Sequence, residues 1–169
     1  VVLVPSFILR PHGVLGSERH FWHEGLMSRG AYAYYKGTYR TSDGKVVPTN
    51  ELIDRLIAEN RVLFYREGIH APVAVVQSPG GQIAMRISGK VEASLAPEGG
   101  TNTDLPHQVL AGHLPMILHP DPKDVLTLGL GGGVTLGTLT LYPVDTIDSL
   151  EISQVVITAA RDFFAASNR

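Results

Sequence analysis

The residues with the clearest chemical potential are a glycine-rich turn and an acidic residue that follows it. Gly129, Gly131, Gly132 and Gly133 come directly after an apolar run, and Glu151 stands 22 residues after Gly129. Such a turn lets backbone atoms approach a ligand closely, and a carboxylate at the end of the next strand can accept hydrogen bonds from both hydroxyls of a ribose. Together they predict a site for a ribose-containing ligand.

The spacing of these glycines limits the kind of ligand. Dinucleotide-binding turns have the pattern G-x-G-x-x-G, whereas this pattern is G-x-G-x-G and Val134 occupies the sixth position. The missing third glycine suits a ligand without a pyrophosphate, such as an adenosyl-sulfonium. No Gly-Lys-Ser/Thr follows, which excludes a Walker-type phosphate loop. The alternative is a purely structural turn next to a solvated Glu151.

This turn needs a strand before it and a helix after it, and the surrounding sequence predicts both. Residues 124–128 are expected to form a buried parallel strand, followed by a helix over 134–142. A second strand over 146–152 and a second helix over 154–168 come next, which is the opening of a doubly wound nucleotide-binding domain. The residues expected on the buried side of the last helix are apolar, namely Val155, Val156, Ala159, Phe163 and Phe164.

The residues before this unit follow a different pattern. Four β-prone runs separated by turn residues predict an antiparallel meander, with strands over 62–65, 73–77, 82–87 and 91–94. A short amphipathic helix is expected over 48–60. A longer helix is expected over 105–118, and Pro115 inside it should kink or shorten that helix.

The predicted fold class is therefore α/β. A lead-in segment, residues 1–60, precedes a small antiparallel β-domain at 61–100. Residues 101–169 are expected to form the first βαβα part of a Rossmann-like domain.

Composition excludes several classes of protein. The 169 residues include no cysteine, so there is no disulfide framework and no thiolate ligand or nucleophile. A net charge of −2 without a basic stripe argues against a nucleic-acid partner. No apolar run reaches the ~18 residues of a membrane span. His113 and His119 are six residues apart, which is the wrong spacing for two ligands on one helix face, so no metal is expected. These features favour a cytoplasmic location.

Several segments resemble the spermidine synthases, or polyamine aminopropyltransferases. The resemblance rests on segments spread from Phe64 to Ile152, namely Phe64–Gly68, Ile87–Lys90, Pro106–Gln108, Leu126–Gly133 and Leu150–Ile152. More narrowly, the chain resembles a divergent bacterial branch in which such a domain follows a multi-helix membrane region. The resemblance implies a parent protein attached to a membrane.

The resemblance also implies that the Rossmann-like domain is of the adenosylmethionine-dependent methyltransferase kind, and it implies the reaction and the roles of some residues. The reaction is transfer of an aminopropyl group from decarboxylated S-adenosylmethionine to a polyamine acceptor, a small molecule. The glycine turn and the segment with Glu151 and Ile152 match the family's cofactor-binding residues, with Glu151 on the adenosyl ribose. His107 and Gln108 match the substrate side. For His107 the alternative is a structural role, in which the ring packs at a helix start and hydrogen-bonds to a loop.

This chain differs from the family at several positions, most of which concern binding of the substrate amine. At six positions where the family has a polar or acidic residue, this chain has a residue without a carboxylate. The residues of this chain at these positions are Pro106, Gln108, Gly132, Ala71, Ser88 and Ser153. Two alternatives follow: a methyltransferase that uses S-adenosylmethionine, or a degenerate, non-catalytic nucleotide-binding module of a membrane protein. The family's catalytic base would lie beyond Arg169, so no catalytic residue is assigned. The chain is expected to be a piece of a longer protein, inactive alone, with an unpaired sheet edge that favours association between copies.

Overall fold

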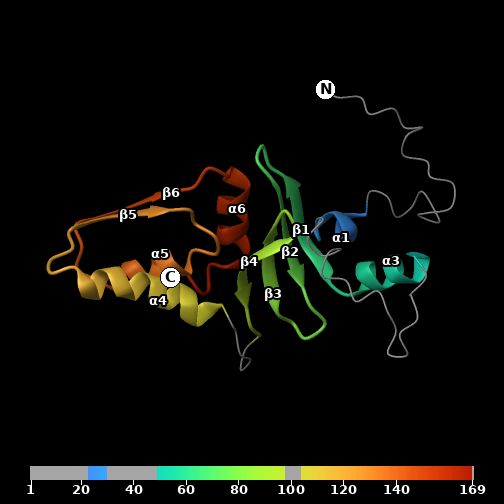
Figure 1. Ribbon diagram of the computed structural model, residues 1–169, viewed down its shortest axis with the longest axis horizontal. Helices are drawn as coiled ribbons and strands as arrows, with labels where there is room; N and C mark the ends of the chain where they lie inside the picture. Colours follow the sequence, from blue (N-terminus) through green and yellow to red (C-terminus); the bar gives the residue numbers. More distant parts are fainter. Residues whose placement is uncertain (1–22, 30–48, 98–103, 169) are drawn as a thin grey trace.

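The computed structural model describes residues 23–29, 49–97 and 104–168. Figure 1 shows a central antiparallel sheet with helices on both sides and a parallel strand pair at one end. The helices are α1 Glu24–Met27, α3 Thr49–Ala58, α4 Leu105–Leu118, α5 Val134–Leu139 and α6 Gln154–Phe163. The strands are β1 Arg61–Glu67, β2 Pro72–Gln77, β3 Ile83–Ile87, β4 Lys90–Leu95, β5 Asp124–Leu128 and β6 Thr146–Leu150.

The antiparallel meander predicted from the sequence is confirmed. The sheet has the order β1-β2-β3-β4, and each strand pairs antiparallel with the next. Between β3 and β4 the chain reverses through Ser88 and Gly89, which have φ values of 50° and 84°. Positive φ at both central residues gives a turn whose twist matches that of the flanking strands, which is why glycine occupies the second position.

The predicted βαβα unit is also present. β5 and β6 pair in parallel, and α5 begins directly after the glycine turn, although it ends at Leu139 instead of 142. Pro115 was expected to kink or shorten α4, and it does not shorten the helix, which continues to Leu118. Because proline has no backbone N–H, the carbonyl of Ala111 lacks its partner within the helix. Ala111 is exposed, so water can form the missing hydrogen bond.

The predicted burial of β5 was wrong. Leu126 and Leu128 are 58% and 80% exposed, and Leu150 of β6, opposite Leu128, is 58% exposed. These three side chains share one face of the strand pair because side chains alternate along a strand. Nothing in the described residues covers that face.

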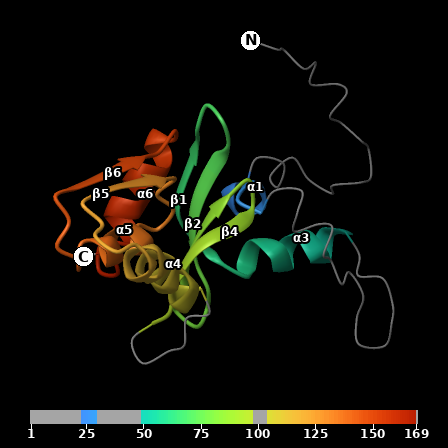
Figure 2. The ribbon, with the colours of Figure 1, turned by 60° about the vertical axis from the view of Figure 1, so that its left-hand side comes forward.

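The main core lies between the sheet and α6. Val73, Val75 and Met85 project from the sheet and meet Phe164, and each of these side chains is at most 1% exposed. Figure 2 shows α6 lying against β1 and β2. The predicted buried side of α6 is confirmed for Val156, Ala159 and Phe164, whereas Val155 and Phe163 are partly buried. The helix ends at Phe163 instead of 168, and residues 165–167 form a turn.

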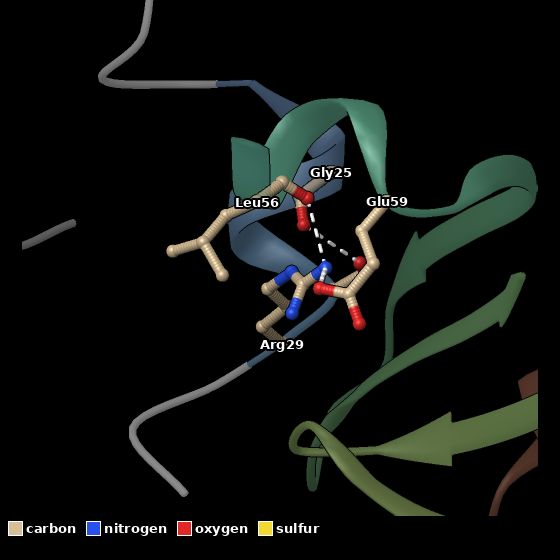
Figure 3. A network of polar contacts seen from close by, with 5 residues as sticks. Gly25, Arg29, Leu56 and Glu59 are labelled. Carbon is tan, nitrogen blue, oxygen red and sulfur yellow. Dashed lines mark hydrogen bonds and ion pairs between the residues drawn. The ribbon is translucent and has the colours of Figure 1, made fainter. Parts of the chain in front are cut away.

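The opposite face of the sheet looks toward α1 and α3 (Figure 1). Arg29, which follows α1, donates from its guanidinium to the Leu56 carbonyl oxygen at 2.8 Å and to the Glu59 carboxylate at 2.6 Å. Figure 3 shows this network, which ties α1 to the end of α3. Nearby, burial is the main cause that raises the pKa of Tyr65 in β1, followed by the negative charge of Glu67.

Some expectations fall outside the described residues. They concern most of the lead-in segment and the loop before α4. The helix predicted over 48–60 corresponds to α3, at Thr49–Ala58. Among the described helices, none has both the length and the apolarity needed to cross a membrane.

Candidate cofactor site

The glycine turn between β5 and α5 is held by backbone hydrogen bonds at both ends. Gly129 N donates to the Leu150 carbonyl at 2.8 Å, which joins the turn to the end of β6. Gly133 N donates to the Leu130 carbonyl at 2.9 Å and closes the turn. Gly129, Gly131 and Gly133 have φ values of 86°, 54° and 83°. Side chains are strained in this left-handed region, so the turn geometry itself requires glycine at alternate positions.

The glycines of the turn differ in what surrounds them. A Cβ at Gly132 would lie 2.9 Å from the Cβ of Ala93, and one at Gly133 would lie 2.7 Å from Nδ2 of Asn168. These two glycines therefore permit close packing within the protein. A Cβ at Gly129 would meet no atom within 4 Å, and one at Gly131 would meet only a backbone oxygen at 4.0 Å. The turn is thus open at Gly129 and Gly131, where a ligand can approach the backbone.

Glu151 lies at the end of β6 and points back to the turn. One carboxylate oxygen accepts a hydrogen bond from Leu130 N and the other accepts one from Ser153 N, both at 2.9 Å. An ionised carboxylate has about four acceptor positions. Glu151 therefore keeps one acceptor position on each oxygen, while its orientation is fixed by the backbone.

Ser153 connects this acid to the core. Its hydroxyl accepts a hydrogen bond from Val156 N at 3.3 Å and caps the N-terminus of α6. The buried face of α6 packs on the antiparallel sheet. The position of Glu151 is consequently set by the same helix that forms the core.

His107 and Gln108 lie in the first turn of α4, close to the start of α5. The hydroxyl of Thr135 donates to the Gln108 carbonyl at 2.9 Å, and Thr135 is the second residue of α5. His107 is exposed, and Ile152, which follows Glu151, is 79% exposed. The fold therefore brings the first turn of α4 next to the helix that follows the glycine turn.

His113 has a structural role. Its Nδ1 lies 2.6 Å from the hydroxyl of Tyr142, and the two rings meet edge to face. Within the described ranges, no three His, Cys, Asp or Glu residues are grouped so that they could hold a metal ion.

Two residues that support the turn were missed in the sequence. Asn168 donates from its side chain to the Gly132 carbonyl at 3.0 Å. Ala93 of β4 faces the same glycine from the sheet. Asn168 is 36 residues from Gly132, and neither contact follows a periodic pattern, so only the tertiary structure could identify them.

The described residues define a class of protein: an antiparallel sheet followed by a methyltransferase-like α/β unit. Solved spermidine synthases have a similar fold. One, in complex with the transition-state analogue AdoDATO, has a TM-score of 0.55 and 25% identity over 64% of this chain and 36% of its own. Another, from Thermotoga maritima, has a TM-score of 0.55 and 26% identity over 63% of this chain and 36% of its own.

Sequence comparisons give a consistent result. Residues 105–168 match the model of the spermine/spermidine synthase domain. A polyamine aminopropyltransferase from Streptococcus pneumoniae serotype 4 is 37% identical over 62 residues, which are 36% of this chain and 22% of that protein. Putrescine N-methyltransferase 2 from Nicotiana tabacum is 41% identical over 64 residues, which are 37% of this chain and 18% of that protein.

These findings confirm the resemblance seen in the sequence: residues 105–168 are similar to the spermine/spermidine synthase domain, and the fold is similar to that of solved spermidine synthases. The matched part spans about a fifth of the length of these curated relatives. The match of the family model begins at the first residue of α4 and ends directly after the turn that follows α6.

Proposed function

We propose that this chain is part of an aminopropyltransferase-like domain that binds decarboxylated S-adenosylmethionine and a polyamine. The orientation of Glu151 is the observation that carries the proposal, because its carboxylate is fixed beside the open part of the glycine turn by two backbone amides. Residues 61–100 form the small β-domain of this arrangement, and residues 101–169 form the start of the cofactor-binding domain.

We propose the following roles, and the geometry of the turn supports those of the adenosyl contacts. Glu151 accepts both ribose hydroxyls, while Gly129 and Gly131 let the adenosyl group lie against the backbone. The exposed side chain of Ile152 offers an apolar surface to the adenine ring. His107 and Gln108 face the polyamine from the first turn of α4.

The reaction requires a neutral acceptor amine. Its lone pair attacks the carbon next to the sulfonium, so a C–N bond forms while the C–S bond breaks. The bonding electrons stay on sulfur, 5′-methylthioadenosine leaves, and the amine proton passes to a base. Binding supplies proximity and orientation. Within residues 1–169 we assign no base.

Methyl transfer from S-adenosylmethionine is the second candidate. The match with a putrescine N-methyltransferase, at 41% identity over 64 residues, favours it. Both reactions use the same adenosyl contacts and differ in the group that leaves the sulfonium. The choice between them therefore depends on whether the site prefers the decarboxylated or the complete methionine moiety.

Ligand-observed NMR with 5′-methylthioadenosine tests the adenosyl site even where affinity is low. We expect saturable binding that Glu151→Gln weakens roughly tenfold or more, because hydrogen bonds to a charged group contribute about 1.5–3 kcal/mol each. Asp148→Asn is the matched control, since Asp148 is an exposed carboxylate on the same strand. A 2′,3′-O-isopropylidene derivative of the ligand removes both hydroxyls without changing the protein.

The possible results separate the proposals. Equal affinity of the wild type and Glu151→Gln, or of the free and the blocked ribose, would overturn the ribose assignment. Tighter binding of decarboxylated S-adenosylmethionine than of S-adenosylmethionine supports aminopropyl transfer, and the reverse order supports methyl transfer. Absence of saturable binding by all three adenosyl ligands would favour a degenerate, non-catalytic module.

A further inference from the structure

A pocket of about 270 Å³ lies on the outer face of the sheet, which is the face directed away from α6. Strand pairing puts Val76, Ala84 and Ser94 in one row across this face. In the next row, Arg86 pairs with Val91. We call this cavity the outer pocket.

The outer pocket is separate from the candidate cofactor site. Met85 and Ala93, the strand neighbours of its lining residues, point to the other side and are buried against α6. Ala93 also faces Gly132 of the glycine turn from that side. The thickness of the sheet therefore lies between the two sites, and the outer pocket does not share a side chain with the adenosyl contacts.

Arg86 gives this pocket its chemical character. Within the part of the chain that the structure describes, its guanidinium has no hydrogen bond or ion pair. Its side chain lies partly buried. Burial, and then the like charge of Arg29, lower the pKa of Arg86, whereas the negative charge of Glu59 raises it. A half-buried guanidinium with five donors and no acceptor favours an anionic ligand.

Glu59, the acid whose charge acts on Arg86, already has another partner. Glu59 pairs with Arg29 at 2.6 Å, as Figure 3 shows. Even so, Nε of Arg29 is buried without a hydrogen-bond partner. Glu59 thus lies near both arginines but is hydrogen-bonded only to Arg29.

The rest of the lining defines the size and charge of the ligand. Val76, Ala84 and Val91 offer a short apolar wall next to Arg86. The volume lies below the ~300–1,000 Å³ typical of sites for drug-sized molecules, so only a small ligand fits. Asp104, which accepts a hydrogen bond from the Ser94 hydroxyl at 2.7 Å, also lines the pocket. Its carboxylate disfavours ligands that carry two negative charges.

We propose that the outer pocket binds a small aliphatic monocarboxylate. The carboxylate lies on the guanidinium of Arg86, whose planar arrangement of donors matches two oxygens at once. The alkyl chain lies against Val76, Ala84 and Val91. This site is independent of the proposed transferase function, because no residue of the glycine turn takes part.

The test is an amide NMR titration of the full chain with sodium butyrate at constant ionic strength. We expect saturable shifts at Ser78 and Gln82, which line the pocket in the turn between β2 and β3. Arg86→Gln should weaken butyrate binding roughly tenfold or more, because it removes the charged donor. Arg161→Gln, on the exposed side of α6, is the matched control and should leave the affinity unchanged.

Other probes separate the proposal from general charge attraction. Butylamine and inorganic phosphate should give no saturable shifts at these positions. Ala84→Leu fills the apolar wall without removing a charge, and it should abolish butyrate binding even if Arg86→Gln fails to fold. Three results would overturn the proposal: no saturable shifts with butyrate, equal affinity for phosphate, or binding that survives Ala84→Leu in a folded chain.

Discussion

The antiparallel sheet and the parallel strand pair contain similar apolar residues but differ in how they are covered. In the sheet, Val75 and Met85 are fully buried because α6 lies against them. In the parallel pair, Leu128 is 80% exposed although it belongs to a strand that is also rich in apolar residues. An apolar strand is thus buried only where a second layer covers it. Because the hydrophobic effect depends on area removed from water, the stability of this chain should reside in the sheet and α6.

Truncation of Phe164 should produce the largest effect. Its ring is fully buried between α6 and the sheet. Phe164→Ala should lower the free energy of unfolding by about 3–5 kcal/mol, through lost burial and a cavity. Urea unfolding followed by circular dichroism measures this difference. Leu128→Ala is the matched control and should change stability by less than about 0.5 kcal/mol. Similar losses for the two variants would contradict the comparison.

A methyl group at Gly132 should produce the next effect, because this residue lies where the two regions meet. A Cβ there would lie 2.9 Å from Ala93 and 3.3 Å from Phe164. Gly132→Ala should therefore destabilise the fold by about 1–3 kcal/mol through overpacking. Thermal unfolding gives the measurement. Gly80→Ala, in an exposed turn where the nearest atom lies 3.9 Å away, is the control. If both variants melted at the same temperature, the contact between turn and sheet would not be tight.

Loss of the Asn168 amide should have the smallest effect. Its Nδ2 donates to the Gly132 carbonyl, which connects the turn after α6 to the glycine turn. Asn168→Asp removes the donor while nearly conserving the volume, and it should cost about 1 kcal/mol. Hydrogen exchange of the Gly133 and Leu130 amides should increase in this variant if the bond stabilises the turn locally. Unchanged exchange would indicate that backbone bonds alone hold the turn.

Much of the fold could be predicted from local patterns. The meander follows from four short β-prone runs and their turn residues, and the βαβα unit follows from a glycine turn placed between a strand and a helix. Element ends were less predictable: α5 ends at Leu139 and α6 at Phe163. Helix ends depend on capping and tertiary contacts, which no periodic pattern records. Burial of β5 was mispredicted for the same reason, since it depends on what lies above the strand.

For the candidate site, the sequence identified the glycine turn and Glu151 but not their supports. The spacing predicted that Glu151 acts together with the glycine turn. In the structure, the Glu151 carboxylate accepts a hydrogen bond from Leu130 N. The contacts of Asn168 and Ala93 with the turn join segments far apart in the chain. Such contacts depend on how α6 and β4 dock, so no local signal could predict them.

The sequence by itself determined which residues can do chemistry and which elements carry them. Glycine at alternate turn positions and a carboxylate after the next strand follow from backbone sterics and hydrogen-bonding capacity, which are local properties. The tertiary structure decided which glycines face a ligand and which face the protein, and it formed the outer pocket around Arg86 from three strands and their connections. These features depend on packing, because burial and close approach involve segments that meet only in the folded chain.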